Sequence, residues 1–477
     1  MAQSHAGNKT AIALVLDVDG SLLKTDMLFE SFWAALGRHP WLCLISVFTL
    51  IFNRPALKKR MAELAGLNIS LLPLRKEIVT LAEDAKEAGR TVILASGSNE
   101  VLVQALSDRL GLVEPAMASN GQINLTRGTK AKALEARFGK RGFEYVGDSE
   151  ADIKVWQAGV GGYIIAPTAK LLRQVSKAQL TLTPIGQRDE GWALLRALRP
   201  HQWVKNILLL LPIVAAHRTD IEGFALAIWG IVVFSAAASS IYIVNDLMDL
   251  EADRKHATKK HRPFAAGTAS IQSGMLTSAA LAIGALGGAA AHSWQLAAII
   301  ALYMVLSLSY SMGLKRLSWV DISTLAALYT LRVVAGAIVA GVPMSGWLGA
   351  FVFPVFLSLG AVKRLIELGK AENEEVLPGR GYARRDRADL RNIAITAAIG
   401  AVVVYTLYTY SEIAAVLYQN LTELRLAAVP VAAWLGRMIY RGWQGRMDYD
   451  PIVFALRDPI GLTLMAIGAG LLVHSAV

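Results

Sequence analysis

Apolar residues follow two different patterns along the chain. Between residues 11 and 180, short apolar runs alternate with stretches of helical periodicity, and the runs 11–18, 91–96, 143–147 and 162–166 have the length of strands. Strands separated by helices predict a parallel sheet that is covered by helices on both faces. The sequence therefore predicts an N-terminal α/β domain.

From about residue 203 the apolar runs become long enough to be candidate membrane spans. A perpendicular span needs about 20 mostly apolar residues. Basic residues gather in every second loop, which is the distribution that the positive-inside rule describes. We therefore expect an all-α polytopic bundle of about nine spans in a bacterial-type inner membrane, with the N-terminal domain in the cytoplasm. The expected spans are 203–216, 224–244, 275–292, 295–313, 320–341, 346–362, 393–411, 426–440 and 453–475.

This division predicts three parts: an α/β domain over 1–183, a linker or amphipathic segment over 184–202, and a membrane domain over 203–477. Within the first part, residues 27–89 are expected to form a helical cap. The apolar run 41–52 is too short to span a membrane. We expect it to form the core of the cap in preference to a helix lying on the bilayer.

Composition agrees with a membrane protein. Hydrophobic residues make up 54% of the 477 residues, and charged residues make up 18%, whereas soluble domains average about 25% charged residues. The formal net charge is +11. Because the basic residues concentrate in short loops, membrane topology explains the excess better than nucleic-acid binding does. One cysteine, Cys43, excludes an intramolecular disulfide framework.

A first group of polar residues follows the predicted strands. An Asp-x-Asp-Gly motif places Asp17 and Asp19 after the first strand. One carboxylate can attack phosphorus and the other can shuttle a proton, which divides a hydrolysis into two easier steps. Later residues suit phosphate oxygens or Mg²⁺, which prefers oxygen ligands. These are Ser96, Lys130, Asp148 and Asp152.

This ordered set resembles the haloacid dehalogenase superfamily across residues 11–180. The resemblance implies a Rossmann-like phosphatase domain in which Asp17 is the nucleophile and Asp19 the acid/base. It also implies two ligand sets: Ser96 and Lys130 for phosphate, and Asp17, Asp19, Asp148 and Asp152 for Mg²⁺. Lys132 is a rival for the lysine role, and the spacing to Leu134 favours Lys130. The same set could also serve only to bind a phosphate.

A second polar group continues the second predicted span. Asn245, Asp246, Asp249 and Asp253 recur at helical spacing, so one side of a helix should carry them. Three carboxylates on one stripe repel each other unless cations lie between them, and a Mg²⁺-bound diphosphate would meet that need. A solvated helix end is the alternative. The direct continuation of a membrane span favours a functional site, because ionisable groups there usually mark function. We call these four residues the acidic ladder.

The spacing Asn-Asp-x-x-Asp-x-x-x-Asp resembles the signature of the UbiA-type prenyltransferases, which implies Mg²⁺-diphosphate binding at the ladder. The usual second motif of that superfamily is Asp-x-x-x-Asp. Here Asp321 is present, but Leu325 stands where the second aspartate would fall. This departure weakens the reading as an ordinary aromatic prenyltransferase.

Further segments resemble one branch, the decaprenyl-phosphate phosphoribosyltransferases, across residues 195–475. They are RPHQWVKN at 199–206, YSMGLKR at 310–316, LRVVAG at 331–336 and GAVKRLIE at 360–367. The resemblance implies a phosphoribosyl diphosphate donor and a polyprenyl phosphate acceptor. A fused phosphatase would then be placed to remove the 5-phosphate of the product.

Other polar residues near span ends are candidates for substrate contact. Arg332 lies inside an apolar span and should face the bundle interior. Asp321 could add a metal ligand. For the remaining bases, a purely topological role is an equal alternative. The remaining candidates are Lys205, Asn206, Lys260, Arg262, Lys315, Lys363 and Arg364.

Two other function classes stay open. One is a prenyl diphosphate:aromatic acceptor transferase whose phosphatase domain has a separate substrate. The other is a lipid-binding or transport protein with a phosphate-sensing domain, which would spread charges along a path across the bilayer. Here the candidate charges collect at one face, which favours an enzyme. Lipid chain length and oligomeric state are not predicted.

Overall fold

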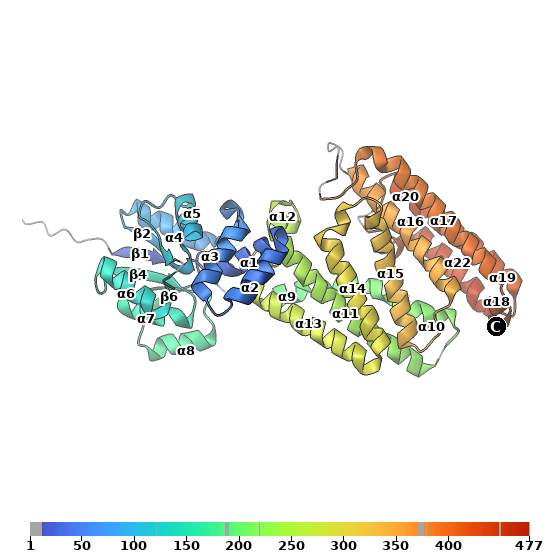
Figure 1. Ribbon diagram of the computed structural model, residues 1–477, viewed down its shortest axis with the longest axis horizontal. Helices are drawn as coiled ribbons and strands as arrows, with labels where there is room; N and C mark the ends of the chain where they lie inside the picture. The colour runs from blue at the N-terminus through green and yellow to red at the C-terminus, as the bar shows by residue number, and fades with distance from the viewer. Residues whose placement is uncertain are drawn as a thin grey trace, which may run out of the picture. The chain divides into compact units, whose positions relative to one another are not determined.

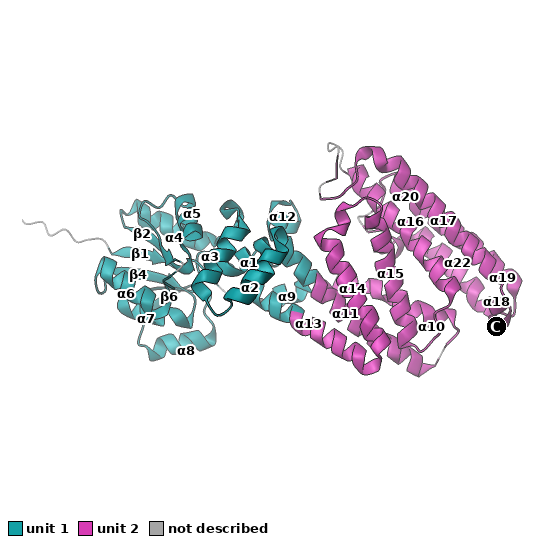
Figure 2. Cartoon of the chain, viewed as in Figure 1, with its two compact units in different colours: residues 1–198, 242–278 teal, residues 199–241, 279–477 magenta. Residues whose placement is uncertain are grey.

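A computed structural model gives the fold of the chain (Figure 1). It divides into two compact units, with residues 1–198 and 242–278 in unit 1 and residues 199–241 and 279–477 in unit 2 (Figure 2). Two of the three unit boundaries fall inside helices, namely α11 (Ile221–Met248) and α13 (Ile271–His292). The segment that carries the acidic ladder therefore belongs to unit 1. The structure describes residues 12–120, 122–186, 190–218, 220–370, 376–377, 379–447 and 450–476.

Unit 1 contains a six-stranded sheet with the order β3-β2-β1-β4-β5-β6, and all of its pairings are parallel. The four predicted strands are confirmed. The prediction missed β3 and β6. The strands are β1 (Ala13–Leu16), β2 (Val92–Asn99), β3 (Met117–Ser119), β4 (Phe143–Gly147), β5 (Gly162–Ile165) and β6 (Leu182–Ile185).

Helices cover both faces of this sheet, as predicted. Leu14 and Leu16 of β1 pack on one side with α4 (Lys76–Glu87) and α5 (Glu100–Arg109). Val15 points to the opposite side, because successive strand residues alternate between faces. There it packs with three helices: α6 (Arg127–Phe138), α7 (Ile153–Ala158) and α8 (Ala169–Lys177).

Three helices after β1 form a separate small cluster: α1 (Met27–Arg38), α2 (Pro40–Leu50) and α3 (Arg54–Ala65). Its buried centre is made of Ala35, Cys43, Met61 and Ala65. The predicted cap range also includes α4, which packs on the sheet. The prediction that the 41–52 run forms the core of the cap is wrong for most of its side chains. In α2, Cys43 and Ser46 are buried, whereas most of the large apolar residues are exposed.

The segment predicted as a linker contains α9 (Glu190–Ala197), and η3 (Pro200–Leu210), a 3₁₀ helix, follows it. Proline at the start of η3 follows Arg199, which has a positive φ of 54°. Beyond it, the chain has seven helices long and apolar enough to cross a membrane among the described residues. These helices are α11, α13, α14 (Trp294–Met312), α15 (Val320–Val339), α16 (Gly346–Lys370), residues 384–408 with α17 (Arg387–Tyr408), and α22 (Pro459–Ala476).

Among the described residues, seven helices meet the length and apolarity of a span, which is fewer than the nine expected. The expected span 203–216 is divided between η3 and α10 (Leu211–Ala215). The expected span 426–440 corresponds to α20 (Ala428–Trp443), which has 16 residues. At about 1.5 Å per residue this helix is shorter than a hydrocarbon core of about 30 Å.

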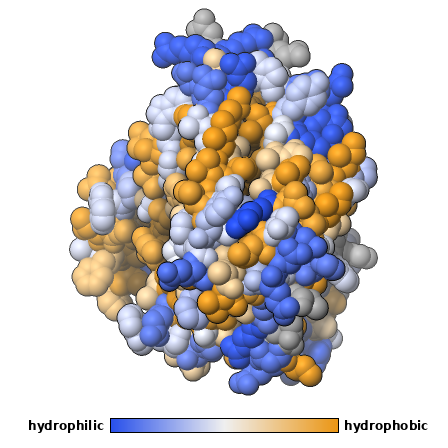
Figure 3. Space-filling model, turned by 90° about the vertical axis from the view of Figure 1, so that its right-hand side faces the viewer, coloured by the Kyte–Doolittle hydropathy of each residue, from blue (hydrophilic) through white to orange (hydrophobic). Residues whose placement is uncertain are grey.

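Several of the long apolar helices leave most of their residues uncovered by protein. In α13, α14 and α22, at most 22% of the most apolar 18-residue window is buried. Figure 3 looks onto the side with the C-terminal helices and shows broad apolar areas there. Exposing this much apolar surface to water is unfavourable, whereas contact with lipid chains is not. The chain is therefore an integral membrane protein.

One glycine of α15 allows η3 to pack closely against this helix. A Cβ on Gly336 of α15 would lie 2.2 Å from the backbone oxygen of Leu209 in η3. Only glycine allows the two backbones to approach this closely, as small residues do at interfaces between membrane helices. The contact fixes η3 against α15.

Candidate active sites

Three carboxylates meet at the carboxyl edge of the sheet in unit 1. Asp17 follows β1, and Asp148 and Asp152 follow β4, the neighbouring strand. Each offers an oxygen, and the three oxygens lie within 4.8 Å of one another. Carboxylate oxygens at this spacing fit a hard divalent cation such as Mg²⁺. Three of the four predicted ligands are therefore brought together, and Asp19 is not part of this group among the described residues.

A buried lysine contacts this group of carboxylates. The Nζ of Lys130 lies 2.6 Å from Oδ1 of Asp17 and donates to the Tyr145 hydroxyl at 2.8 Å. That hydroxyl donates to Oδ1 of Asp152 at 2.9 Å. Lys130, and not its rival Lys132, thus reaches the site. Sequence reasoning missed Tyr145, because a tyrosine in a buried strand gives no sign of a polar role.

Burial dominates the electrostatics of this site. It raises the pKa of the Asp17 carboxyl well above its usual range, although the Lys130 ammonium opposes the shift. The carboxylates of Asp152 and Asp148 raise the Asp17 pKa further. A divalent cation among these groups would relieve their repulsion, because an opposite charge favours the ionised carboxylate. The electrostatics thus agree with a cation site.

Asp19 is held in a fixed orientation beside this group. Its Oδ1 accepts a hydrogen bond from the Met27 amide at 2.8 Å, and its Oδ2 accepts from Ser96 at 3.0 Å and Ser98 at 2.6 Å. Ser96 therefore positions Asp19, and its contact with phosphate stays a prediction. Ser98 was missed. Glycine is favoured next in the motif, because the φ of Gly20 is +76° and a Cβ there would lie 2.2 Å from Oδ2 of Asp148.

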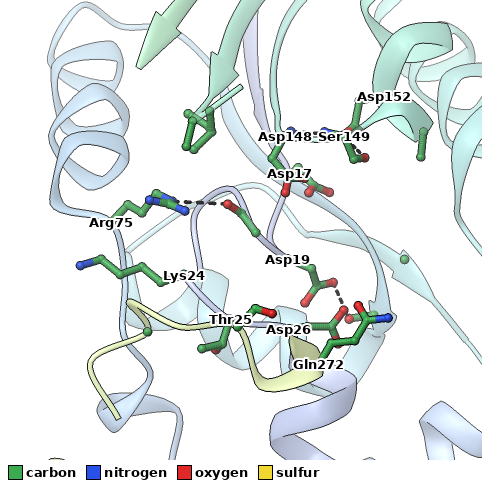
Figure 4. A pocket seen from close by; sticks show the side chains of 18 of the residues that line it. Asp17, Asp19, Lys24, Thr25, Asp26, Arg75, Asp148, Ser149, Asp152 and Gln272 are labelled. Atoms are coloured by element: carbon green, nitrogen blue, oxygen red, sulfur yellow. Dashed lines mark hydrogen bonds between the residues drawn. The ribbon is translucent and has the colours of Figure 1, made fainter. Parts of the chain in front are cut away.

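A pocket of about 660 Å³ opens onto these residues, and its volume is typical of small-molecule sites. Figure 4 shows the carboxylates of Asp17, Asp148 and Asp152 in one part of it, and Lys24 and Arg75 in another. Residues of the segment 267–272, which follows the acidic ladder in the chain, also line it. The cations that line it are Lys24, Lys58, Arg75, Arg127 and Lys130.

A buried ion pair connects the cap helices to the segment of the acidic ladder. Arg254 of α12 (Leu250–Lys255) donates to both carboxylate oxygens of Glu30 in α1, at 3.0 and 2.6 Å. Thr25 donates to the same carboxylate at 2.7 Å, and Arg254 also donates to the Ala265 carbonyl at 3.0 Å. Nearby, Gly267 packs against Lys24. Within unit 1, residues 250–272 thus form part of the surroundings of the pocket.

The acidic ladder spans two helices and not one. α11 ends at Met248, and Asp249 precedes α12. Helical hydrogen bonds nevertheless run through the break, from Asp249 to Asn245 at 3.0 Å and from Asp253 to Asp249 at 2.8 Å. The ladder therefore stays on one side, which explains how Asp246 and Asp253 come to share a partner.

That partner is Arg262, whose Nη1 lies 3.1 Å from Asp246 and 2.7 Å from Asp253. Both aspartates are only 2% exposed. Burial raises the pKa of Asp253, and the guanidinium of Arg262 opposes this shift. In addition, the buried Oδ1 of Asn245 accepts no hydrogen bond from the part of the chain that the structure describes. Lys260, in contrast, is exposed.

These features fit a Mg²⁺-diphosphate better than a bare metal ion. Within the described residues, the ladder does not bring three carboxylates within 4.8 Å, as the first site does. Mg²⁺ is usually held by one or two carboxylates together with substrate phosphate oxygens. Two buried carboxylates and the unsatisfied oxygen of Asn245 offer such a partial set of ligands.

Asp321 in unit 2 has a different environment from the one predicted. It is fully buried, and its carboxylate accepts from Arg364 at 2.5 and 3.1 Å, from Arg380 at 3.2 Å and from Tyr310 at 3.0 Å. Arg364 also pairs with Glu367. Two guanidiniums contact its oxygens, so Asp321 orders arginines in this structure, and its role as a metal ligand stays a prediction.

A second polar cluster lies inside the bundle of unit 2. Arg332 is buried, as predicted, and donates to Asn206 at 3.0 Å and to the Tyr303 hydroxyl at 3.2 Å. Asn206 in turn donates to Ser235 at 2.8 Å. The structure thus brings together two predicted residues that lie 126 positions apart.

The other predicted bases lie at different depths. Lys205 is buried and pairs with Asp450, a residue that sequence reasoning missed. Lys363 and Lys315 are half-buried.

The fold and the ladder define a polytopic membrane transferase. The chain belongs to the UbiA prenyltransferase family, whose match covers residues 207–457, more than half of the chain. That match does not extend into the N-terminal domain.

Relatives at the level of sequence include three proteins from bacteria. Uncharacterized protein y4nM of Sinorhizobium fredii is 33% identical over 94% of this chain and 88% of its own length. Nodulation protein NoeC of Azorhizobium caulinodans is 34% identical over 58% of this chain and 91% of its own length. Decaprenyl-phosphate phosphoribosyltransferase of Mycobacterium tuberculosis is 33% identical over 46% of this chain and 74% of its own length.

Among solved structures, a UbiA homologue from Archaeoglobus fulgidus bound to DMAPP and Mg²⁺ covers 59% of this chain and 99% of its own. Its sequence identity is 14% and its TM-score is 0.46.

Proposed function

We propose that the membrane domain transfers a 5-phosphoribosyl group from phosphoribosyl diphosphate to a polyprenyl phosphate. The observation that carries the proposal is the pair of buried aspartates, Asp246 and Asp253, which both contact the guanidinium of Arg262. The buried side-chain oxygen of the neighbouring Asn245 accepts no hydrogen bond from the described residues. Relatives named decaprenyl-phosphate phosphoribosyltransferase support the choice of donor and acceptor.

The chemistry needs no covalent intermediate on the protein. A phosphate oxygen of the acceptor attacks the anomeric carbon of the ribose, and the bond from that carbon to the diphosphate breaks. Mg²⁺, when bound with the diphosphate, neutralises charge on the leaving group. Asp246 and Asp253 would hold that assembly, and Arg262, which contacts both carboxylates, would add a positive charge next to it. Fixed positions for donor and acceptor supply much of the rate, since orientation replaces a bimolecular encounter.

We further propose that the N-terminal pocket is a phosphatase that removes the 5-phosphate of the lipid product. Asp17 attacks phosphorus, and the ester oxygen leaves with a proton from Asp19. Water then hydrolyses the aspartyl-phosphate and regenerates Asp17. Lys130 offsets negative charge at Asp17. The 5-phosphate is a monoester and the lipid linkage a diester, so a monoesterase attacks only the former.

The tandem scheme draws support from the lining of the pocket. Residues of 267–272, which follow the ladder in the chain, contribute to the same pocket as Asp17. Covalent fusion also raises the local concentration of product at the second site. The final product would be a polyprenyl-phosphoribose.

The donor is tested with the full chain in lipid nanodiscs containing Mg²⁺. We expect consumption of phosphoribosyl diphosphate with polyprenyl phosphate. Labelled prenyl diphosphate with aromatic acceptors should give no product, and product there would favour the rival prenyltransferase. Asp246→Asn should abolish transfer, whereas Glu222→Gln, an exposed acid at the start of α11, should not. Normal transfer by the first variant would refute the ladder assignment.

The phosphatase is tested by the mass of the lipid product. The parent protein should yield the ribosyl lipid, and Asp17→Asn should yield a product heavier by one phosphate group. Asp108→Asn, at an exposed acid on α5, serves as the matched control and should behave like the parent. Identical masses from the parent and Asp17→Asn would show that the tandem scheme is wrong.

A further inference from the structure

The helix α2 presents a continuous apolar stripe outside the protein. The exposed fractions are 77% for Trp41, 86% for Phe48 and 100% for Phe52, which follows the helix. Leu44 and Ile45 are also exposed. Positions 41, 44, 45 and 48 are separated by three, four and seven residues, so they share one side of the helix. The opposite side carries Cys43 and Ser46, which are buried, and Cys43 packs with residues of α1 and α3.

We propose that α2 lies in the headgroup region of the bilayer, with this stripe in contact with lipid. Its 11 residues extend over about 16 Å, which is too short to cross a hydrocarbon core of about 30 Å. A short helix with one apolar side lies in the plane of the interface instead. Unit 1 includes one end each of α11 and α13, two of the long apolar helices, so the chain itself connects this unit to a bilayer.

The charge around α2 favours a lipid surface over a protein partner. Residues 31–62 contain no aspartate or glutamate, and Arg54 and Lys59, which follow α2, are exposed. Such a basic segment next to an apolar helix is attracted to anionic lipid headgroups. A second copy of this chain is a poor occupant, because its net charge of +11 would repel the same basic segment.

A second helix of unit 1 has the same character. Trp192 and Leu195 of α9 are exposed and lie three residues apart, so they share a side. Arg196 follows them and is exposed as well. α9 ends at Ala197, directly before unit 2 begins at Arg199. An aromatic residue with a neighbouring base is typical of helices at membrane interfaces.

The inference is tested with spin labels on the full chain in nanodiscs that contain anionic lipid. In a Cys43→Ala background, one nitroxide is attached through Phe48→Cys and a control nitroxide through Val113→Cys, a site that is 97% exposed on the same unit. Collisions with oxygen, which concentrates in lipid, are compared with collisions with a water-soluble nickel chelate. We expect the oxygen-to-nickel ratio to be several-fold higher at residue 48 than at residue 113.

Two outcomes would overturn the inference. Equal ratios at both sites would mean that α2 lies in water. Low collision rates with both reagents at residue 48 would mean that protein covers it, either another part of this chain or a second copy. A label at Leu44→Cys, on the same stripe, guards against a local disturbance at position 48. The result does not depend on either proposed activity.

Discussion

The ion pair between Glu30 and Arg254 gives a quantitative prediction for unit 1. Their side chains are 2% and 7% exposed, and two hydrogen bonds join them. Glu30→Gln preserves the shape but leaves the arginine as a buried charge without its counter-ion. Breaking a buried pair from one side costs about 3–5 kcal/mol. The remaining bond from Arg254 to Ala265 cannot compensate the charge.

This cost should appear as a lower melting temperature. A change of 1 kcal/mol shifts the Tm by about 2–4 °C in a unit of 150–250 residues, so Glu30→Gln should lower it by roughly 6–20 °C. The assay is differential scanning fluorimetry of the full chain in nanodiscs, followed for the transition of unit 1. Arg38→Gln is the control, since it breaks an exposed pair with Glu251. Exposed pairs contribute about 0–1 kcal/mol.

A double variant distinguishes charge burial from general damage. Glu30→Leu with Arg254→Met removes both charges and should recover most of the Tm lost in Glu30→Gln, because apolar replacement of a buried pair is often neutral. If Glu30→Gln melts within a degree or two of the parent, the pair does not hold residues 250–272 to the cap helices. Additive losses in the double variant would likewise refute the reasoning.

Three further predictions concern the two sites and the bundle. Lys130→Met should lower hydrolysis of a chromogenic phosphate ester by about 10²-fold or more without changing the yield of transfer, and equal loss of both would contradict separate sites. EDTA should stop both activities and excess Mg²⁺ should restore them; activity that persists in EDTA would exclude a divalent cation. Gly336→Ala should lower the Tm of unit 2, because the added Cβ would clash with the backbone of Leu209. Gly400→Ala is the control and should leave the Tm unchanged, because a Cβ there meets nothing within 4 Å. Equal melting of these two glycine variants would contradict the close packing of η3.

The sequence predicted the sheet and its first site because both depend on local patterns. An apolar strand ending at Asp17, and a second ending at Asp148, suffice to place two carboxylates at one edge. β6 was missed because Pro184 lies within it and the segment was interpreted as a turn. A proline is tolerated there since β6 is an edge strand of the sheet.

Contacts between distant parts of the chain could not be predicted. Glu30 and Arg254 lie 224 residues apart, and neither lies in a motif. Hydropathy also cannot tell an apolar helix that is buried from one that is exposed, which is why α2 was assigned to the cap core. For the same reason the short helices η3 and α20 were counted as spans. The break between α11 and α12 at Asp249 could not be predicted, because the helical spacing of the ladder continues through it.

The central claim, that the acidic ladder binds a cation together with diphosphate, can be measured directly. Mn²⁺ replaces Mg²⁺, and electron paramagnetic resonance counts the bound ion in the full chain with and without inorganic diphosphate. Asp17→Asn serves as the common background, so that the phosphatase site contributes little. Diphosphate should increase Mn²⁺ binding in this background, and adding Asp246→Asn should remove the increase. An undiminished diphosphate-dependent increase in the double variant would contradict the account.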